Sequence, residues 1–352
     1  MPPLRFLSRL PMAAGLALPL AGCNPILLNA PGDVARQQGD LIIISTLLML
    51  IIIVPVIALT LFFAWRYRAS NTRATYKPDW DHSTRLELVI WAAPLMIIIA
   101  LGSITWITTH TLDPYRPLER IAPGKPVPEG VEPLEVEVVS LDWKWLFIYP
   151  EQNIATVNEL AAPVDRPIRF KLTSSTVMNA FYVPALAGMI YTMPGMQTEL
   201  NAVISTPGEY EGFSSNYSGA GFSGMRFRFH ALDEAGFDAW VDQVRGSGQV
   251  LGRDGYLELE KPSEREPVRH YASVEAGLYD AILNRCVDPR RMCLHEMMAI
   301  DAGKGPGRTR MEGLEARQRG DLRGRPYVQS AMCAAGDPPT AGLAGQLSRS
   351  AP

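Results

Sequence analysis

Side chains that could hold a transition metal are few in this sequence and lie far apart. Its 352 residues include four cysteines, at positions 23, 286, 293 and 333. Thiolate and imidazole are the ligands that zinc and copper prefer, and a structural zinc site needs four ligands close together. The cysteines are too scattered for a four-thiolate zinc site or a disulfide scaffold.

Cys286 and Cys293 are the one pair of cysteines that lie near each other in the sequence. Together with His295 they form a Cys-Cys-His group, but no fourth ligand is evident, which argues against a metal. In an oxidising compartment the two thiols could form a disulfide. Two free buried thiols are the alternative, because spacing does not establish geometry.

The composition excludes several classes of protein. The chain is 47% apolar, which supports a sizeable core and, at this length, about two domains. Its net charge is -3 and its pI is about 6.0, with no sustained basic stripe. DNA or RNA is therefore excluded as the main partner.

The N-terminus has the parts of an export signal. Arg5 and Arg9 precede an apolar run, and the small residues Ala21 and Gly22 follow it. Leu20-Ala21-Gly22-Cys23 resembles a bacterial lipobox, so we expect residues 1–22 to be a signal peptide of the lipoprotein type. Cys23 would then be the lipid attachment site that begins a periplasmic segment, 23–40. An ordinary export signal is the alternative.

Two apolar segments, 41–64 and 88–109, are predicted to cross the membrane as helices. The uninterrupted stretch Leu41 to Phe63 has 23 residues without a charge, enough for the roughly 30 Å hydrocarbon core. Trp91 and Trp106 flank the second segment, as interfacial aromatics do. Neither segment contains Asp, Glu, Lys, Arg or His, so no proton relay runs through them.

The connecting loop sets the orientation. Residues 65–87 carry five positive side chains, whereas 23–40 carries only Arg36. The positive-inside rule therefore places residues 65–87 in the cytoplasm and both chain ends outside.

The exported part begins after a Pro-rich linker, 110–132. Apolar and polar residues then alternate, as in Leu134 to Val138 and Phe227 to His230, which predicts half-buried strands and a β-sandwich over 133–250. Asp233 is a candidate N-cap of a closing helix that ends at Gly246, with one apolar face formed by Phe237, Trp240, Val241 and Val244.

A dense aromatic strand lies within this domain and contains Trp143, Trp145, Phe147 and Tyr149. These side chains either pack within the sandwich or form a docking face over a redox partner.

A helical C-terminal extension is predicted over 265–302, with a helix over residues 273–285. The tail 303–352 is rich in glycine and proline and is predicted to be disordered. We assign no role to the tail or to its Cys333.

Several of these motifs carry a family resemblance. The lipobox, the helical hairpin, the Trp143 to Pro150 strand, and Phe181-Tyr-Val-Pro184 followed by Pro194-Gly195 resemble subunit II of haem-copper respiratory oxidases. The segments 271–286 and 292–298 are similar to the extension of the ubiquinol oxidase branch, the cytochrome bo type. The resemblance covers roughly residues 20 to 300 and implies a cupredoxin-like sandwich. The expected fold is thus a membrane-anchored α+β chain with a transmembrane hairpin, a periplasmic cupredoxin-like β-sandwich and a helical C-terminal extension.

In the cytochrome c oxidase branch this domain holds two copper ions through the pattern Cys-x-x-x-Cys-x-x-x-His-x-x-Met and one further histidine. The matching positions here are Ser214, Ser218, Phe222 and Met225, with Asn179 at the position of the further histidine. A serine hydroxyl stays protonated and cannot replace a bridging thiolate, and phenylalanine has no lone pair. We therefore expect no metal, and neither His110 nor His230 lies where it could rebuild the centre.

The resemblance then implies a noncatalytic, cofactor-free subunit II of a proton-translocating ubiquinol oxidase in the bacterial inner membrane. Its partners would be subunits I, III and IV, with the haems and copper in subunit I. Without a copper centre, soluble cytochrome c is not expected as a partner, and quinol is the natural donor. The residues do not distinguish ubiquinol from menaquinol, or the haem type. The alternatives are an envelope lipoprotein that uses its sandwich for sensing or assembly, and a copper electron carrier.

Overall fold

The structure, a computed structural model, describes residues 25–75 and 77–301. The predicted signal peptide, Cys23 and the tail with Cys333 lie outside the described residues.

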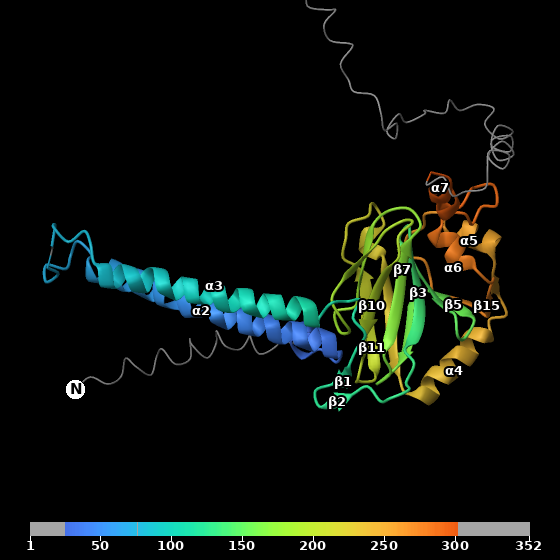
Figure 1. The fold of residues 1–352 in the computed structure, drawn as a ribbon, viewed down its shortest axis with the longest axis horizontal. Coiled ribbons are helices and arrows are strands. Elements are labelled where there is room, and N and C mark those ends of the chain that lie inside the picture. The colour runs from blue at the N-terminus through green and yellow to red at the C-terminus, as the bar shows by residue number, and fades with distance from the viewer. Residues whose placement is uncertain (1–24, 76, 302–352) are drawn as a thin grey trace, which may run out of the picture. The chain divides into compact units, whose positions relative to one another are not determined.

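Two long helices come first. A short 3-10 helix, η2 (Ile26–Asn29), precedes α2 (Asp33–Arg66) and α3 (Thr84–Thr111), and the two long helices lie side by side in Figure 1. Both are long and apolar enough to cross a membrane. Each extends beyond its predicted apolar segment at both ends. In α2 the added ends carry Asp33 in the first turn and Arg66 in the last, the charges that suit the helix dipole.

Two sheets form the sandwich seen in Figure 1. The six-stranded sheet has the order β10-β7-β3-β4-β5-β14, where the strands are Thr198–Ala202, Ile168–Ser174, Leu134–Leu141, Lys144–Tyr149, Ile154–Val157 and Arg269–Tyr271. The five-stranded sheet has the order β6-β12-β11-β8-β9, where the strands are Glu159–Pro163, Arg226–Leu232, Gly208–Ser214, Asn179–Tyr182 and Ile190–Thr192. Strands β3 and β7 pair in parallel, as do β6 and β12, so the sandwich is of mixed type.

Aromatic residues join the two sheets. Trp145 of β4 meets Phe181 of β8 edge to face, with ring centroids 5.5 Å apart. Phe181 in turn stacks on Phe227 of β12 at 5.4 Å. Such pairs add to the free energy gained by burying the rings. The predicted alternation is confirmed in the first half of β3, where Leu134, Val136 and Val138 are buried and the residues between them are partly exposed.

A small hairpin and a helix complete the sandwich. The predicted linker contains β1 (Arg120–Ala122) and β2 (Lys125–Pro126). Helix α4 (Glu234–Arg245) begins after Asp233, whose side chain accepts a hydrogen bond from the backbone N–H of Gly236. Its buried face consists of the four predicted apolar residues, so the predicted cap and face are both confirmed.

The C-terminal extension differs from its prediction. It contains β13 (Val250–Leu251), α5 (Arg253–Leu259), β15 (Ser273–Val274), α6 (Leu278–Leu283) and α7 (Leu294–Asp301), in addition to β14. The predicted helix over 273–285 was wrong at its start, because Ser273 and Val274 pair with β13 instead. Gly277 then adopts a φ of 74°, a left-handed conformation that glycine tolerates, and the helix begins after it.

A second apolar cluster fixes this extension to the sandwich. It joins residues of the six-stranded sheet, such as Leu146 and Ile148, to Tyr256 of α5 and Ile282 of α6. Strand β14 also adds an edge strand to that sheet by pairing with β5. The extension is therefore an integral part of the fold and not an appended peptide.

Candidate functional site

The loop that connects β11 to β12 contains the positions at which the resembling family binds copper. It runs from Ser214 to Met225 and includes the short 3-10 helix η3 (Phe222–Gly224). The indole of Trp143 packs against it and donates a hydrogen bond to the carbonyl of Ser218 at 2.9 Å. A Cβ atom at Gly221 would lie 2.5 Å from that ring, so only glycine fits under the indole.

Asn179 and Ser214 occupy two of the predicted ligand positions and contact each other. They lie on the adjacent strands β8 and β11, and both are almost fully buried. The Ser214 hydroxyl donates to Oδ1 of Asn179 at 3.1 Å and accepts from the backbone N–H of Ala180 at 3.4 Å. The two side chains thus satisfy each other by hydrogen bonding, as buried polar groups require.

The remaining three positions offer no better ligands. The Ser218 hydroxyl is buried and has no hydrogen-bond partner among the described residues. The Phe222 ring lies edge-on to Tyr217, with centroids 5.6 Å apart. Met225 is fully buried in the main apolar core. Copper centres of this kind need thiolate and imidazole, and these residues supply neither. The residues present do not fit a dinuclear copper site.

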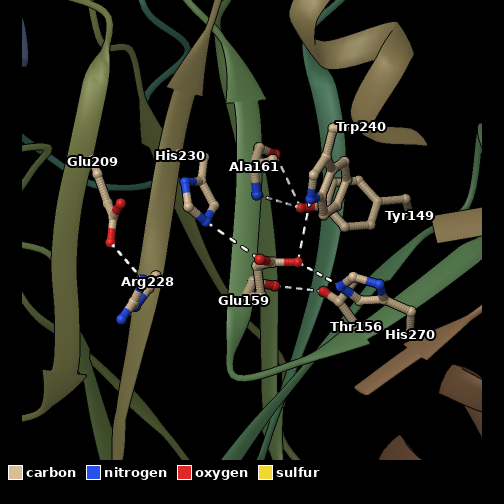
Figure 2. Close-up of polar contacts among 9 residues, drawn as sticks. All are labelled: Tyr149, Thr156, Glu159, Ala161, Glu209, Arg228, His230, Trp240 and His270. Atoms are coloured by element: carbon tan, nitrogen blue, oxygen red, sulfur yellow. Dashed lines mark hydrogen bonds and ion pairs between the residues drawn. The ribbon is translucent and has the colours of Figure 1, made fainter. Parts of the chain in front are cut away.

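The histidine of β12 takes part in a different cluster. Figure 2 shows the carboxylate of Glu159 between two imidazoles, those of His230 and His270. His270 Nε2 lies 2.6 Å from Oε2, His230 Nε2 lies 3.3 Å from Oε1, and the Trp240 indole donates to Oε2 at 3.2 Å. Within residues 25–75 and 77–301, no group of three His, Cys, Asp or Glu side chains is arranged to hold a metal.

The aromatic strand β4 is largely internal. Trp145, Phe147 and Tyr149 have no exposed surface, and Trp143 is half-buried against the 214–225 loop. The Tyr149 hydroxyl donates to the carbonyl of Ala161 and accepts from its N–H, both at 2.9 Å (Figure 2). Burial raises the pKa of Tyr149 far above its usual value. The surface that this aromatic segment can offer a partner is confined to Trp143, the residue that precedes β4.

Cys286 and Cys293 are joined by a disulfide, with their Cα atoms 4.8 Å apart. The bridge closes a short loop after α6, and Asp288 within it accepts two hydrogen bonds from the guanidinium of Arg290. These side-chain bonds, with one from the Arg290 backbone N–H, hold the pKa of Asp288 below its usual value. His295 is exposed.

Sequence reasoning missed the junction that fixes the first long helix to the sandwich. Asp33 is almost fully buried, and the guanidinium of Arg120 donates to its Oδ2 at 2.9 Å. Gly32 donates a hydrogen bond to the carbonyl of Ala185, and a Cβ on Gly32 would lie 2.3 Å from the carbonyl oxygen of Leu186. A cavity of about 270 Å³ lies at this junction and is lined by the ends of both long helices. No sequence pattern marks these contacts, because the partners are distant in the chain.

Segments of the sandwich, the 214–225 loop among them, expose apolar side chains, and we group six of these side chains as one patch. We call it the Met189 patch. Ser215 contacts the Met189 sulfur at 3.1 Å, and Asn216 donates to the carbonyl of Met178, so these segments adjoin. Met189 also lines the cavity at the helix junction, which makes the patch continuous with that junction. The exposed members of the patch are Val177, Met178, Met189, Tyr191, Met196 and Tyr217.

Two family models match the domain that follows the two long helices. Residues 136–231 match the model described as cytochrome c oxidase subunit II, periplasmic domain. Residues 245–290 match the model described as the COX aromatic rich motif. The first match covers most of the sandwich, and the second covers the extension from the end of α4 to the disulfide loop.

Curated relatives match most of the chain. It is 51% identical over 269 residues to cytochrome bo(3) ubiquinol oxidase subunit 2 of Pseudomonas aeruginosa, covering 76% of this chain and 78% of the relative. It is 50% identical over 281 residues to ubiquinol oxidase subunit 2 of Acetobacter aceti, covering 79% and 89%. It is 42% identical over 258 residues to quinol oxidase subunit 2 of Bacillus anthracis, covering 72% and 85%.

Proposed function

The chain belongs to the family of ubiquinol oxidase subunit 2, within the haem-copper respiratory oxidases, and on that premise we propose how it serves the oxidase. It is a subunit of an oxidoreductase complex, with a cupredoxin-like domain and two candidate membrane helices. Family membership does not favour the alternative of an envelope lipoprotein used for sensing or assembly.

The chain binds no copper and takes no electrons from a soluble cytochrome. The observation that supports this is the hydrogen bond between Ser214 and Asn179, which joins two positions that would otherwise supply a thiolate and an imidazole. Electrons must then enter the complex within the membrane, where ubiquinol is the donor of matching solubility. In this proposal the haems and copper reside in subunit I, which carries out oxygen reduction and proton translocation.

The chain's own role is to brace and cap subunit I from the periplasmic side. The apolar faces of α2 and α3 are exposed in the isolated chain and suit contact with lipid and with helices of subunits I, III and IV. The Met189 patch adjoins the helix junction and so lies where the domain would rest on subunit I. The Asp33–Arg120 pair and the close approach of Gly32 hold the domain at the end of α2.

The N-terminal end adds a second attachment to the membrane. Residues 1–22 act as a lipoprotein signal, and acyl groups on Cys23 anchor the mature N-terminus at the outer leaflet of the inner membrane. The 65–87 loop is cytoplasmic and both chain ends are periplasmic, as the distribution of arginine and lysine favours.

Purification of the complex through a tag on this chain tests the proposal. We expect a haem-containing, multi-subunit assembly that oxidises a soluble ubiquinol with oxygen consumption and does not oxidise reduced cytochrome c. A haem-free single chain, or oxidation of cytochrome c at a comparable rate, would contradict the proposal. Comparing ubiquinol with menaquinol in the same assay identifies the quinone.

A further inference from the structure

The hairpin end opposite the sandwich contains a cavity that the proposed function does not use. It has a volume of about 950 Å³ and lies where α2 ends and the connecting loop begins. Its wall includes Phe63 and Arg66 of α2, and the loop supplies the rest. The cavity therefore adjoins the apolar surface that faces the membrane.

The charge of the cavity wall is of one sign. Arg66, Arg68 and Lys77 all line it, and none of its described lining residues is acidic. None of these three side chains forms an ion pair with another described residue. The acids of the loop, Asp79 and Asp81, flank Trp80 in the sequence but do not line the cavity. Glu87, at the start of α3, is paired with His82 at 2.7 Å. Three cations in one concavity raise the local concentration of anions.

Aromatic side chains complete the site. Tyr67 and Trp80 line the cavity beside the three cations. The Arg68 guanidinium lies 5.4 Å from the ring centroid of Trp65, a cation–π contact that restrains its position. Phe63 is about half exposed on the adjoining turn of α2. A ligand that suits this wall has an anionic head and an apolar tail.

We propose that this cavity binds the headgroup of an anionic phospholipid in the cytoplasmic leaflet. The proposal rests on the proposed topology, in which this end of the hairpin is cytoplasmic. A phosphodiester can accept hydrogen bonds from the two arginines and the lysine. The acyl chains can then lie along the exposed apolar side chains of α2. A zwitterionic headgroup would bring its own cation against Arg66 and Lys77, so phosphatidylcholine should bind poorly.

Lipid retention by the purified complex tests this site. The detergent-purified oxidase is delipidated, titrated with phosphatidylglycerol, and analysed by native mass spectrometry. Arg66→Gln with Lys77→Gln should weaken retention by about fivefold for each charge removed. Arg73→Gln with Arg85→Gln is the matched control, since it removes two charges from the same 65–87 segment, one in the loop and one at the start of α3, and neither lines the cavity. The control should retain the lipid as the wild type does.

Several outcomes would overturn the proposal. Retention of phosphatidylglycerol could fall equally in both double variants, or it could be unchanged in the cavity variant. Phosphatidylcholine could bind as tightly as phosphatidylglycerol, or inorganic phosphate could displace the lipid. Haem content per complex shows that each variant assembles. Labelling of a Ser70→Cys variant that also carries Cys333→Ser, compared with the Cys333→Ser parent, by an impermeant maleimide in inverted and right-side-out vesicles tests the topology separately. Labelling from the periplasmic side would refute the topology itself, whatever lipid is retained.

Discussion

His270 of β14 lies 2.6 Å from the Glu159 carboxylate of β6, across a separation of 111 residues in the sequence. Strand β14 is part of the C-terminal extension and lies in the six-stranded sheet, whereas β6 lies in the five-stranded sheet. The contact therefore ties the extension to the opposite sheet of the sandwich. Trp240 of α4 donates to the same carboxylate, and His230 of β12 lies 3.3 Å from it, so four elements meet at one acid (Figure 2).

Loss of this carboxylate should loosen the extension. We expect Glu159→Gln to lower the free energy of unfolding by about 1–3 kcal/mol, because one of the two acceptor oxygens becomes an amide NH2 and the partly buried groups on that side lose their acceptor. Chemical unfolding of the full-length protein in detergent measures the effect. Arg228→Gln is the control, since its pair with Glu209 is mostly exposed and should contribute less than about 1 kcal/mol. Equal effects of the two variants would show that Glu159 has no special role.

A second acid should make stability depend on pH. Burial, with a smaller contribution from the Glu135 charge, raises the pKa of Glu137 from 4.5 to about 7, although Lys171 opposes the shift. The folded state therefore holds this proton more tightly than the unfolded state does. Stability is expected to fall as pH rises from about 4.5 to about 7, and the loss is complete above that range.

The Glu137→Gln substitution should remove most of this dependence of the free energy of unfolding on pH. The variant is expected to be more stable than the wild type above pH 7, by about 1–2 kcal/mol once partial solvent screening is allowed for. Unfolding curves at pH 5 and pH 8 measure the difference. Glu258→Gln, at an exposed carboxylate, should keep the wild-type slope. A Glu137 variant with an unchanged slope would rule out this acid as the cause.

The disulfide should contribute to the stability of the extension. Closing so short a loop is worth about 2.5 kcal/mol in the chain-entropy model. Cys286→Ser and Cys293→Ser should each cost about that amount, and the double variant should cost no more than either single variant. Cys333→Ser is the matched control and should leave stability unchanged. Thiol counting by mass spectrometry on unreduced protein checks the pairing, and alkylation of both cysteines would refute it.

The proposed lipid anchor at Cys23 should be dispensable for membrane association. Cys23→Ala is expected to abolish incorporation of labelled palmitate, yet the protein should remain in the membrane fraction because α2 and α3 are long and apolar enough to cross the membrane without the lipid. Cys333→Ala should retain the label. Release of the Cys23 variant into the soluble fraction would show that the hairpin does not span the membrane.

Local patterns predicted local structure well. The alternation in β3 and the cap and face of α4 followed from the residues, because period and capping act within a few positions. The predicted helix over 273–285 was wrong at its start because Ser273 and Val274 pair with β13, which lies more than twenty residues earlier in the chain.

The contacts that join the first long helix and the C-terminal extension to the sandwich are long-range. Glu159 with His270, and Asp33 with Arg120, join segments that only the complete fold brings together. The five positions matched to copper ligands were identified through the family motif. Only the structure showed that two of them, Asn179 and Ser214, form a hydrogen bond.

The copper content of this chain, separated from its partner subunits after purification of the complex, tests the central claim most directly. We predict no bound copper above background and no thiolate–copper absorption. The variant Asn179→His, Ser214→Cys, Ser218→Cys, Phe222→His is the positive control and should take up copper. Stoichiometric copper in the wild-type chain would contradict the account.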